Sequence, residues 1–352
     1  MRRSERWRRL AAAAAWAVAL AAGGCLLAGC SPLYVLRAGY EEARILWRRQ
    51  PIEELLADPL LDADTKSKLA LALDARAFAR DRLGLRAAGS FSSFARVDAD
   101  QVVHVVLAAY RERLELVTWW FPIVGRVPYR GFFDQAEAHA AAAELEAEGY
   151  DTVVQPSVAF STLGWFDDPL LSNLLRLDRV SLAAVIMHEL THNTRYLPGH
   201  GAFNESFANF VGYSGTVAFF TARGESDNAA RAEQLWQDAL AFSAFLGRLT
   251  ASMRAAYASG IDDSERRRRL SRGQTEFRAL PLQTNLYADF ARAPLNNASL
   301  LHYAMYNERL ELFAAMQARA RGNLAAAIAQ VLQVAAGAAD PYAALAAHLG
   351  SN

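Results

Sequence analysis

Cysteine is nearly absent from this chain. Cys25 and Cys30 are the only two in 352 residues, and both lie within the first thirty. A disulfide between two later residues is therefore excluded, whatever compartment the protein occupies. The fold must take its stability from packing, to which a bound metal could add. The remaining chain is long enough to bury a large core in one elaborate domain or two close ones.

An excess of either charge is absent as well, because 37 basic residues balance 37 acidic ones. Without a net positive charge, nothing in the composition predicts a nucleic-acid partner. The one basic run, residues 266–269, stands beside Asp262, Asp263 and Glu265. We interpret this run as a solvated helix face, with contact to anionic lipid as the alternative.

The first thirty residues have the order of an export signal. Several arginines precede an almost unbroken apolar run at 11–22, and small residues then lead to Leu27-Ala28-Gly29-Cys30. This ending resembles a bacterial lipobox, which implies that 1–29 are a signal peptide and that Cys30 carries a lipid. By the same resemblance, Ser31 implies retention in the cell envelope at the outer membrane, facing the periplasm. The alternative is an uncleaved anchor, although the apolar run is short for the roughly 20 residues that span a bilayer.

Internal repeats and long Gly/Ser linkers are absent too, so we treat residues 30–352 as a single domain. Asp134 and Glu137 predict a capping box for a helix that stops at Gly149. Strands are predicted from Val-rich, aromatic or extended runs at 102–108, 115–128 and 150–161. Helical spacings of apolar residues occur at 38–86, 180–196, 202–220, 228–270 and 298–349. The predicted class is α+β, mostly helical, with a small mixed sheet and helical extensions at both ends.

The candidate chemistry lies in His188-Glu189-Leu190-Thr191-His192. On a helix, His188 and His192 project from one face and can share a metal ion. Glu189 is offset by about 100° around the axis, where its carboxylate can act as a base toward water at the open position of the metal. Apolar neighbours predict a buried helix, in which two histidines and a glutamate would be costly to bury without a metal or hydrogen-bond partners. The alternative is an amphipathic helix with two hydrogen-bonded histidines.

A catalytic zinc usually takes three protein ligands and leaves one position for water. Two candidates for the third ligand follow His192, namely His200 and Glu205. The metzincin pattern places its third histidine six residues after the second, and His200 misses that register because it is eight residues on. We prefer Glu205, and we interpret His200 as a loop residue or an indirect partner of the site.

The run Asn204-Glu205-Ser206-Phe207-Ala208 resembles the Asn-Glu-x-x-Ala segment of gluzincin peptidases, in which a second helix supplies the glutamate ligand. The resemblance implies a zincin-like domain with its metal-site core at about 115–225. It also implies one Zn²⁺ per chain, held by His188, His192 and Glu205. Asn209, one turn after Glu205, would orient a ligand histidine.

Over most of the chain, the sequence resembles a family of predicted bacterial aminopeptidases found as envelope lipoproteins. The segments that carry this resemblance are 127–133, 161–169, 188–209 and 295–298. The resemblance implies hydrolysis of peptides outside the cytoplasm and an acidic group that holds the free amine of the substrate. The Gly-x-Met-Glu-Asn run of aminopeptidase N-like enzymes is missing, so Asp167 and Asp168 are candidates for that group. The alternative is that they form a turn.

The implied reaction is metal-assisted hydrolysis. Zinc polarises the scissile carbonyl and lowers the pKa of its water towards ~7, while Glu189 takes the proton and passes it to the leaving amine. The oxyanion needs a further donor, for which Tyr306 is preferred over Tyr303 and His302. An endopeptidase is the nearest rival. A non-catalytic envelope lipoprotein that uses a zincin scaffold for binding is the alternative from another class, but a purely structural zinc site would not need Glu189.

Overall fold

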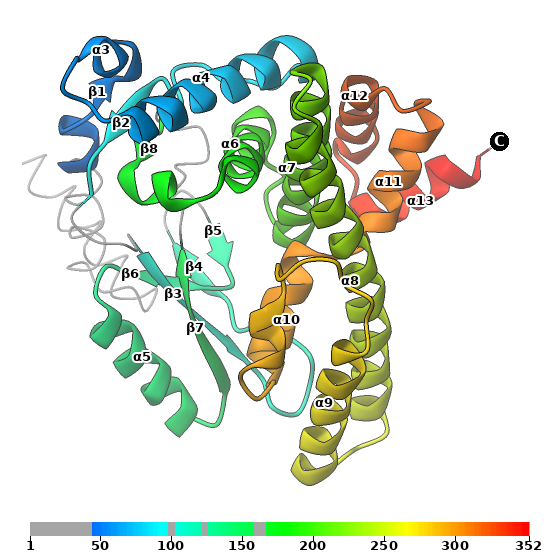
Figure 1. Ribbon diagram of the computed structural model, residues 1–352. Helices are drawn as coiled ribbons and strands as arrows, with labels where there is room; N and C mark the ends of the chain where they lie inside the picture. Colours follow the sequence, from blue (N-terminus) through cyan, green and yellow to red (C-terminus); the bar gives the residue numbers. More distant parts are fainter. Residues whose placement is uncertain (1–43, 98–102, 122–124, 158–166, 352) are drawn as a thin grey trace, which may run out of the picture.

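The structure is a computed structural model that describes residues 44–97, 103–121, 125–157 and 167–351 (Figure 1). Cys30 and the predicted signal peptide lie outside these residues, as do positions 161–166 of the family-like segment. Among the described helices, none has both the length and the hydropathy of a membrane span.

Helices dominate the described chain, and short strands make up a smaller part, which confirms the α+β class. The helices are α3 (Ile52–Ala57), α4 (Ala63–Leu83), α5 (Gln135–Ala147), α6 (Arg179–Thr194), α7 (Gly201–Ala222), α8 (Ser226–Ala258), α9 (Asp263–Arg278), α10 (Asn297–Tyr306), α11 (Leu310–Arg319), α12 (Leu324–Ala335) and α13 (Pro341–Gly350), with short 3₁₀ turns at η1 (Ser172–Arg176) and η2 (Ala288–Ala291). The predicted cap of α5 is present, because the Asp134 carboxylate accepts from the Glu137 N–H. Gly149 then adopts a φ of +96°, which favours glycine after a helix.

Within the described residues the strands form three small sheets, where the sequence predicted one. A mixed sheet has the order β1 (Gln50–Pro51), β2 (Ser93–Ala95), β8 (Leu170–Leu171); an antiparallel sheet has the order β6 (Arg130–Phe132), β3 (Val103–Ala109), β7 (Asp151–Ser157); and β4 (Trp119–Phe121) pairs with β5 (Gly125–Val127). The strand character predicted for 115–128 is found in β4 and β5, which form an antiparallel pair. Pro122, which has no N–H to donate to a ladder, falls between them.

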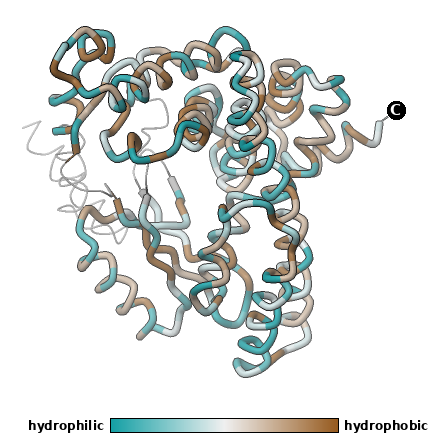
Figure 2. Tube along the Cα trace, in the orientation of Figure 1, coloured by the Kyte–Doolittle hydropathy of each residue, from teal (hydrophilic) through white to brown (hydrophobic). Residues whose placement is uncertain are grey.

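The helices pack into one large hydrophobic cluster, to which α4, α6, α7, α8 and α10 to α13 all contribute. In Figure 1, α6 and α7 occupy the middle of this assembly, α4 crosses above them and α8 runs alongside. Figure 2 shows polar positions along the outer helices α4 and α9 and apolar positions on α6. The sheet β6-β3-β7 has its own small cluster with α5, and α10 contacts β3 and β7 from the helical side.

Two glycines allow α6 and α7 to pack closely. A Cβ atom on Gly212 would lie 2.9 Å from the carbonyl oxygen of Ala184 and 3.5 Å from the Cβ of His188. A Cβ atom on Gly215 would lie 2.7 Å from the sulfur of Met187. Larger side chains at either position would push the helices apart, so these glycines fix how near α7 comes to the His-Glu-x-x-His helix.

The basic run at 266–269 lies on α9, as expected, but one of its members is not solvated. Arg266 is buried, and its guanidinium forms ion pairs with Asp151 on β7 and with Asp263. The interpretation of the whole run as a solvated face is therefore wrong for Arg266. Burial of an arginine is tolerated here because two carboxylates compensate its charge.

Candidate metal centre

Helices α6 and α7 bring together the three predicted ligands. The Nε2 atoms of His188 and His192 are 3.1 Å apart. The Glu205 Oε2 atom lies 3.3 Å from the Nε2 of His188 and 3.5 Å from the Nε2 of His192. Among the described residues, these form the one group of at least three His, Cys, Asp or Glu side chains close enough to share an ion.

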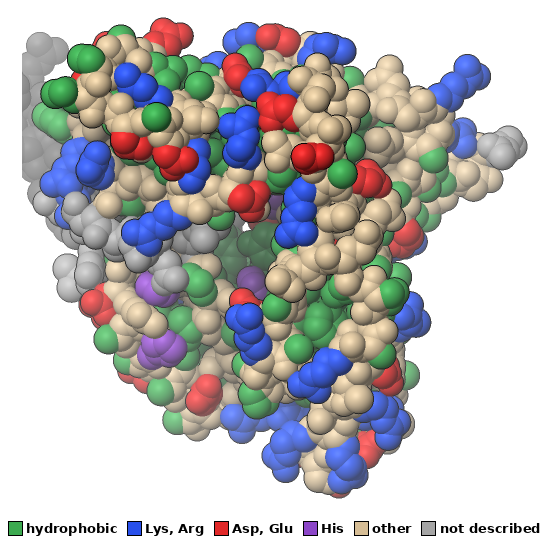
Figure 3. Space-filling view, in the orientation of Figure 1, with side chains coloured by type: hydrophobic (Ala, Val, Ile, Leu, Met, Phe, Trp, Pro, Cys, Tyr) green, Lys and Arg blue, Asp and Glu red, His purple; other side chains and the backbone are tan. Residues whose placement is uncertain are grey.

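These separations fit zinc. Ligand atoms about 2.0–2.1 Å from a tetrahedral ion lie roughly 3.3 Å from one another, which agrees with all three distances. Two nitrogens and one carboxylate are also a donor set that zinc accepts at catalytic centres. The surface is hollowed between the helical part and the sheet, and histidine side chains are visible inside the hollow (Figure 3).

An asparagine fixes the tautomer of His188. The side-chain N–H of Asn209 donates to the carbonyl oxygen of Tyr306 at 2.6 Å, so the amide oxygen of Asn209 must face His188. That oxygen lies 3.0 Å from His188 Nδ1 and can only accept, which places the proton on Nδ1. His188 Nε2 then presents its lone pair to the point between the three ligand atoms. Asn209 therefore has the orienting position that the sequence predicted for it.

The charges of His188, His192 and Glu205, which we call the trio, favour a cation between them. Burial alone would raise the pKa of Glu205, but His192 and His188 lower it below its ordinary value. Burial would likewise lower the pKa of His192, but the Glu205 carboxylate, through its charge and a hydrogen bond, and the charge of Glu189 raise it. The site thus holds negative charge that a proton or a metal ion can neutralise.

Glu189 is half-buried on α6, next to His188. Its charge raises the pKa of His192 and of Tyr306, so its carboxylate faces the same space as the trio. Within the described chain, this carboxylate makes no hydrogen bond and no ion pair. It is therefore available to water or to a substrate.

The loop between α6 and α7 is held by Asn204, for which the sequence alone predicts no separate role. The Asn204 side chain accepts from the Leu197 N–H at 2.9 Å and donates to the Leu197 carbonyl at 2.8 Å. This reciprocal pair closes the loop and places Glu205 at the start of α7. His200 is the residue before α7 and is not part of the group of potential ligands.

Tyr306 is the oxyanion candidate that lies at the site. Its ring stacks on that of His188, with centroids 6.4 Å apart and an interplanar angle of 25°. The negative charge of Glu205, together with burial, raises the pKa of Tyr306 well above its ordinary value. The phenol therefore keeps its proton and can donate a hydrogen bond.

The other two candidates differ in position. The Tyr303 ring packs into an aromatic cluster with Phe242 and Phe290 at centroid distances of 5.9 Å and 5.1 Å. His302 lies beside Tyr306, with centroids 5.5 Å apart, and its buried Nδ1 has no hydrogen-bond partner. Burial lowers the pKa of His302 to about 4, so its ring is neutral. Tyr303 is a core residue, whereas His302 borders the site.

Helix α10 is anchored at both ends, which positions Tyr306. At its start, Asn296 caps the helix and donates to the Thr152 carbonyl on β7 at 2.8 Å. At its end, the Ser206 hydroxyl on α7 donates to the Met305 carbonyl at 3.1 Å and accepts from the Glu308 N–H at 2.8 Å. These hydrogen bonds link α10 to β7 at one end and to α7, which carries Glu205, at the other.

Sequence reasoning also missed Tyr196. Its ring lies 6.5 Å from that of His192, centroid to centroid. Burial and the charge of Glu205 raise its pKa. Helical spacing does not identify it, because α6 ends at Thr194 and Tyr196 lies in the loop that follows.

The two aspartates considered for amine binding are tied to another loop. The Asp167 carboxylate accepts from the Gly89 N–H at 2.8 Å. The backbone of Asp168 accepts from the Phe91 N–H at 2.8 Å and donates to the Ser90 hydroxyl at 3.2 Å. These hydrogen bonds give both aspartates a structural role in joining two distant loops, although residues 167–169 form no turn of their own.

Comparison with known proteins adds one finding. The model of a family described as "Putative aminopeptidase" matches residues 33–342. The match includes α6, α7 and α10, which carry the trio, Asn209 and Tyr306. The comparison with curated proteins and that with solved structures give no match.

Proposed function

Because the chain belongs to this aminopeptidase family, we propose that it is a zinc-dependent peptidase that removes residues from the free N-terminus of peptides. The observation that carries the zinc proposal is the set of separations of 3.1, 3.3 and 3.5 Å among His188, His192 and Glu205. Side chains that packed together by chance would not reproduce all three edges of a tetrahedral site. In this proposal the domain is zincin-like and its metal ligands are of the gluzincin type.

Zinc, when bound, supplies Lewis-acid polarisation of a peptide carbonyl and lowers the pKa of water. Glu189 takes a proton from the attacking water and delivers it to the leaving amine. Its carboxylate suits both steps because no other described residue pairs with it. Asn209 keeps His188 Nε2 free of a proton, which preserves the ligand geometry throughout.

Tyr306 donates a hydrogen bond to the oxyanion that develops on the scissile carbonyl. Its proton is retained because Glu205 and burial both disfavour the phenolate. The carboxylates whose charge acts on the side chains around the trio are Glu189 and Glu205. With Glu205 on the metal, Glu189 is the described acid nearest to an incoming substrate amine.

The proposal places the enzyme in the cell envelope. Cleavage before Cys30 and lipidation of its thiol would hold the domain at the outer membrane, facing the periplasm. The substrate would then be a peptide in that compartment.

A metal analysis tests the zinc site. A soluble form beginning at Ser31 keeps every described residue and can be assayed for zinc by elemental mass spectrometry. We expect about one zinc per chain, clear loss in Glu205→Ala and retention in Glu189→Gln. A well-folded parent that holds no zinc after incubation with the ion would overturn the proposal.

Activity on peptides then separates the two kinds of peptidase. An aminopeptidase cleaves a peptide with a free N-terminus and not its N-acetylated form, and Glu189→Gln abolishes cleavage while keeping zinc. Equal cleavage of both forms would identify an endopeptidase. Zinc binding without any cleavage, across a broad set of peptides, would support the binding lipoprotein instead.

A further inference from the structure

Two large apolar side chains stand out on the surface of the described chain. Trp47 is 90% exposed and Leu60 is 91% exposed, whereas the next three, Trp120, Tyr129 and Leu286, are 38% to 45% exposed. The loop that presents Leu60 is ordered by its own hydrogen bonds, since the Leu60 N–H donates to the Asp58 carboxylate at 2.8 Å. Isolated exposed leucines are common, but a tryptophan that is nearly fully exposed is unusual and marks a candidate contact surface.

The chain neighbours of both side chains line the same cavity. A pocket of about 230 Å³ opens between β1, β2 and the α3–α4 region, and it is lined by Arg48, Gln50, Leu55, Leu61, Thr65, Leu69, Phe94 and Arg96. Trp47 directly precedes Arg48, and Leu60 directly precedes Leu61. We call Trp47, Leu60 and this cavity, with its two arginines, the N-terminal face.

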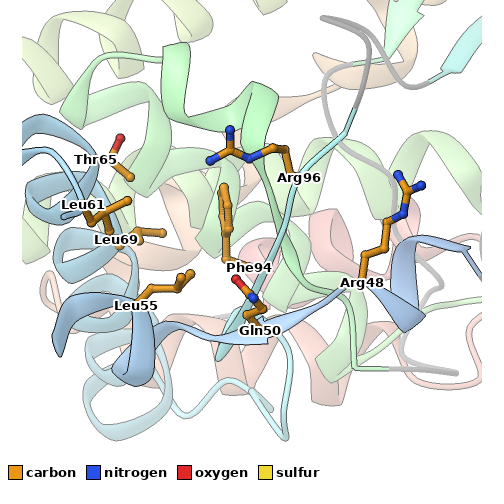
Figure 4. Close-up of a pocket in the computed structure, with 8 residues that line it drawn as sticks. All are labelled: Arg48, Gln50, Leu55, Leu61, Thr65, Leu69, Phe94 and Arg96. Atoms are coloured by element: carbon orange, nitrogen blue, oxygen red, sulfur yellow. The ribbon is translucent and has the colours of Figure 1, made fainter. Parts of the chain in front are cut away.

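The cavity combines an apolar floor with positive charge. Figure 4 shows Phe94 in the middle, the leucines on one side and Arg48 on the other, with Arg96 extending above Phe94. Leu69 and Phe94 are buried, while Arg48 and Arg96 are exposed. None of the eight described lining residues is acidic. The exposed guanidinium of Arg96 therefore makes the cavity complementary to an anion that is attached to apolar matter.

With the proposed anchor, the length of the chain before residue 44 limits how far this face can lie from a membrane. The described fold starts at residue 44, three residues before Trp47. In the proposed anchoring through Cys30, the 14 residue steps to Arg44 span at most about 50 Å. An uncleaved apolar anchor at 11–27 would impose a similar limit. Either way, the N-terminal face is the described surface that follows the anchor most closely along the chain.

We infer that the N-terminal face docks onto the surface of an anionic phospholipid bilayer. Trp47 and Leu60 enter the interfacial layer, where the amphipathic ring of tryptophan is favoured. Arg96 binds a headgroup phosphate at the mouth of the cavity, and the apolar floor of the cavity receives the first part of an acyl chain. The anchor and the N-terminal face together attach the domain to the membrane at two places. Two attachments fix the orientation of the domain, whereas the anchor alone would not. This inference rests on the proposed envelope location and not on peptidase activity, so each can fail alone.

Vesicle binding by the soluble form that begins at Ser31 tests the docking, because this form has no lipid and no apolar signal segment. We expect it to sediment with vesicles of phosphatidylcholine and phosphatidylglycerol in a 3:1 ratio, and far less with phosphatidylcholine alone. Added salt should weaken the binding. Arg96→Gln should weaken it about fivefold, the effect of removing one cation near a charged membrane. The double variant Trp47→Ser, Leu60→Ser should weaken it at least about tenfold.

A matched double variant, Leu286→Ser with Arg292→Gln, removes an exposed leucine and an exposed arginine elsewhere and should bind as the parent does. Circular dichroism and zinc content check that each variant is folded. A parent that binds neither vesicle, or binds both equally, would overturn the inference. So would equal losses in the matched control and in the variants of the N-terminal face.

Discussion

Replacing Gly212 by alanine is expected to weaken zinc binding, although Gly212 is not itself a candidate ligand. The new Cβ atom would lie 2.9 Å from the carbonyl oxygen of Ala184, and an ordinary contact begins at about 3.4 Å. Helices α6 and α7 must therefore separate locally by about 0.5 Å, because a backbone carbonyl cannot rotate away. Glu205 lies on α7 and both histidines lie on α6, so this separation opens the trio.

The expected magnitude follows from the tolerance of the site. Zinc–ligand distances vary by only about 0.2 Å in working sites, and disturbance of the groups that orient ligands costs roughly 10–100-fold in affinity. We expect the zinc dissociation constant of Gly212→Ala to rise by at least about tenfold. The metal-free protein should change less, since overpacking costs ~1–3 kcal/mol while alanine regains ~1 kcal/mol of helix propensity.

Gly247→Ala is the matched control. Gly247 is exposed in the middle of α8, and an added Cβ atom would have no neighbour within 4 Å. This variant should be more stable by ~0.5–1 kcal/mol and should bind zinc as the parent does. Chelator competition measures the zinc affinity, and urea unfolding of the metal-free forms measures the stability. If Gly212→Ala is stabilised like Gly247→Ala and keeps the parental zinc affinity, the close packing of α6 and α7 does not control the site.

Three further substitutions test separate contacts. Asn209→Ala should raise the zinc dissociation constant about 10–100-fold in chelator competition, because His188 loses the acceptor that fixes its tautomer. Tyr306→Phe should lower kcat for peptide cleavage about 100-fold with zinc content unchanged, and an unchanged kcat would remove Tyr306 from the mechanism. Asn204→Ala leaves the Leu197 N–H unpaired, while the Leu197 carbonyl keeps the hydrogen bond from the His200 N–H, so urea unfolding should show a loss of ~1–3 kcal/mol, against a loss near zero if water replaces the amide.

The parts of the site that are close in sequence could be predicted. The spacing of four between His188 and His192 puts both rings on one face of any helix, whatever surrounds it. Glu205 and Asn209 needed more than periodicity, because their helix must return across α6. That return depends on Gly212 and on the clamp between Asn204 and Leu197, neither of which has a signature in the sequence.

Long-range contacts account for what could not be predicted. Tyr303 and Tyr306 lie on the same helix, and no local pattern says which one faces the metal helices. Arg266 looked like its solvated neighbours because its partner Asp151 is 115 positions away. The strands β1 and β8 have two residues each, too few for an alternating pattern to be read.

The position of α10 shows how distant segments combine at one side chain. The carbonyl of Tyr306 holds the amide of Asn209 in the orientation that places the proton of His188 on Nδ1. The ring of the same tyrosine stacks on His188 from outside the trio. One residue at the end of α10 therefore contacts the metal site twice, once through backbone and once through side chain. Because Ser206 and Asn296 tie the two ends of α10 to α7 and to the sheet, a shift of the sheet would alter both contacts together. We therefore expect a substitution along α10 that weakens zinc binding also to lower the rate of peptide cleavage that depends on Tyr306. This should hold even where the substituted residue lies far from the trio.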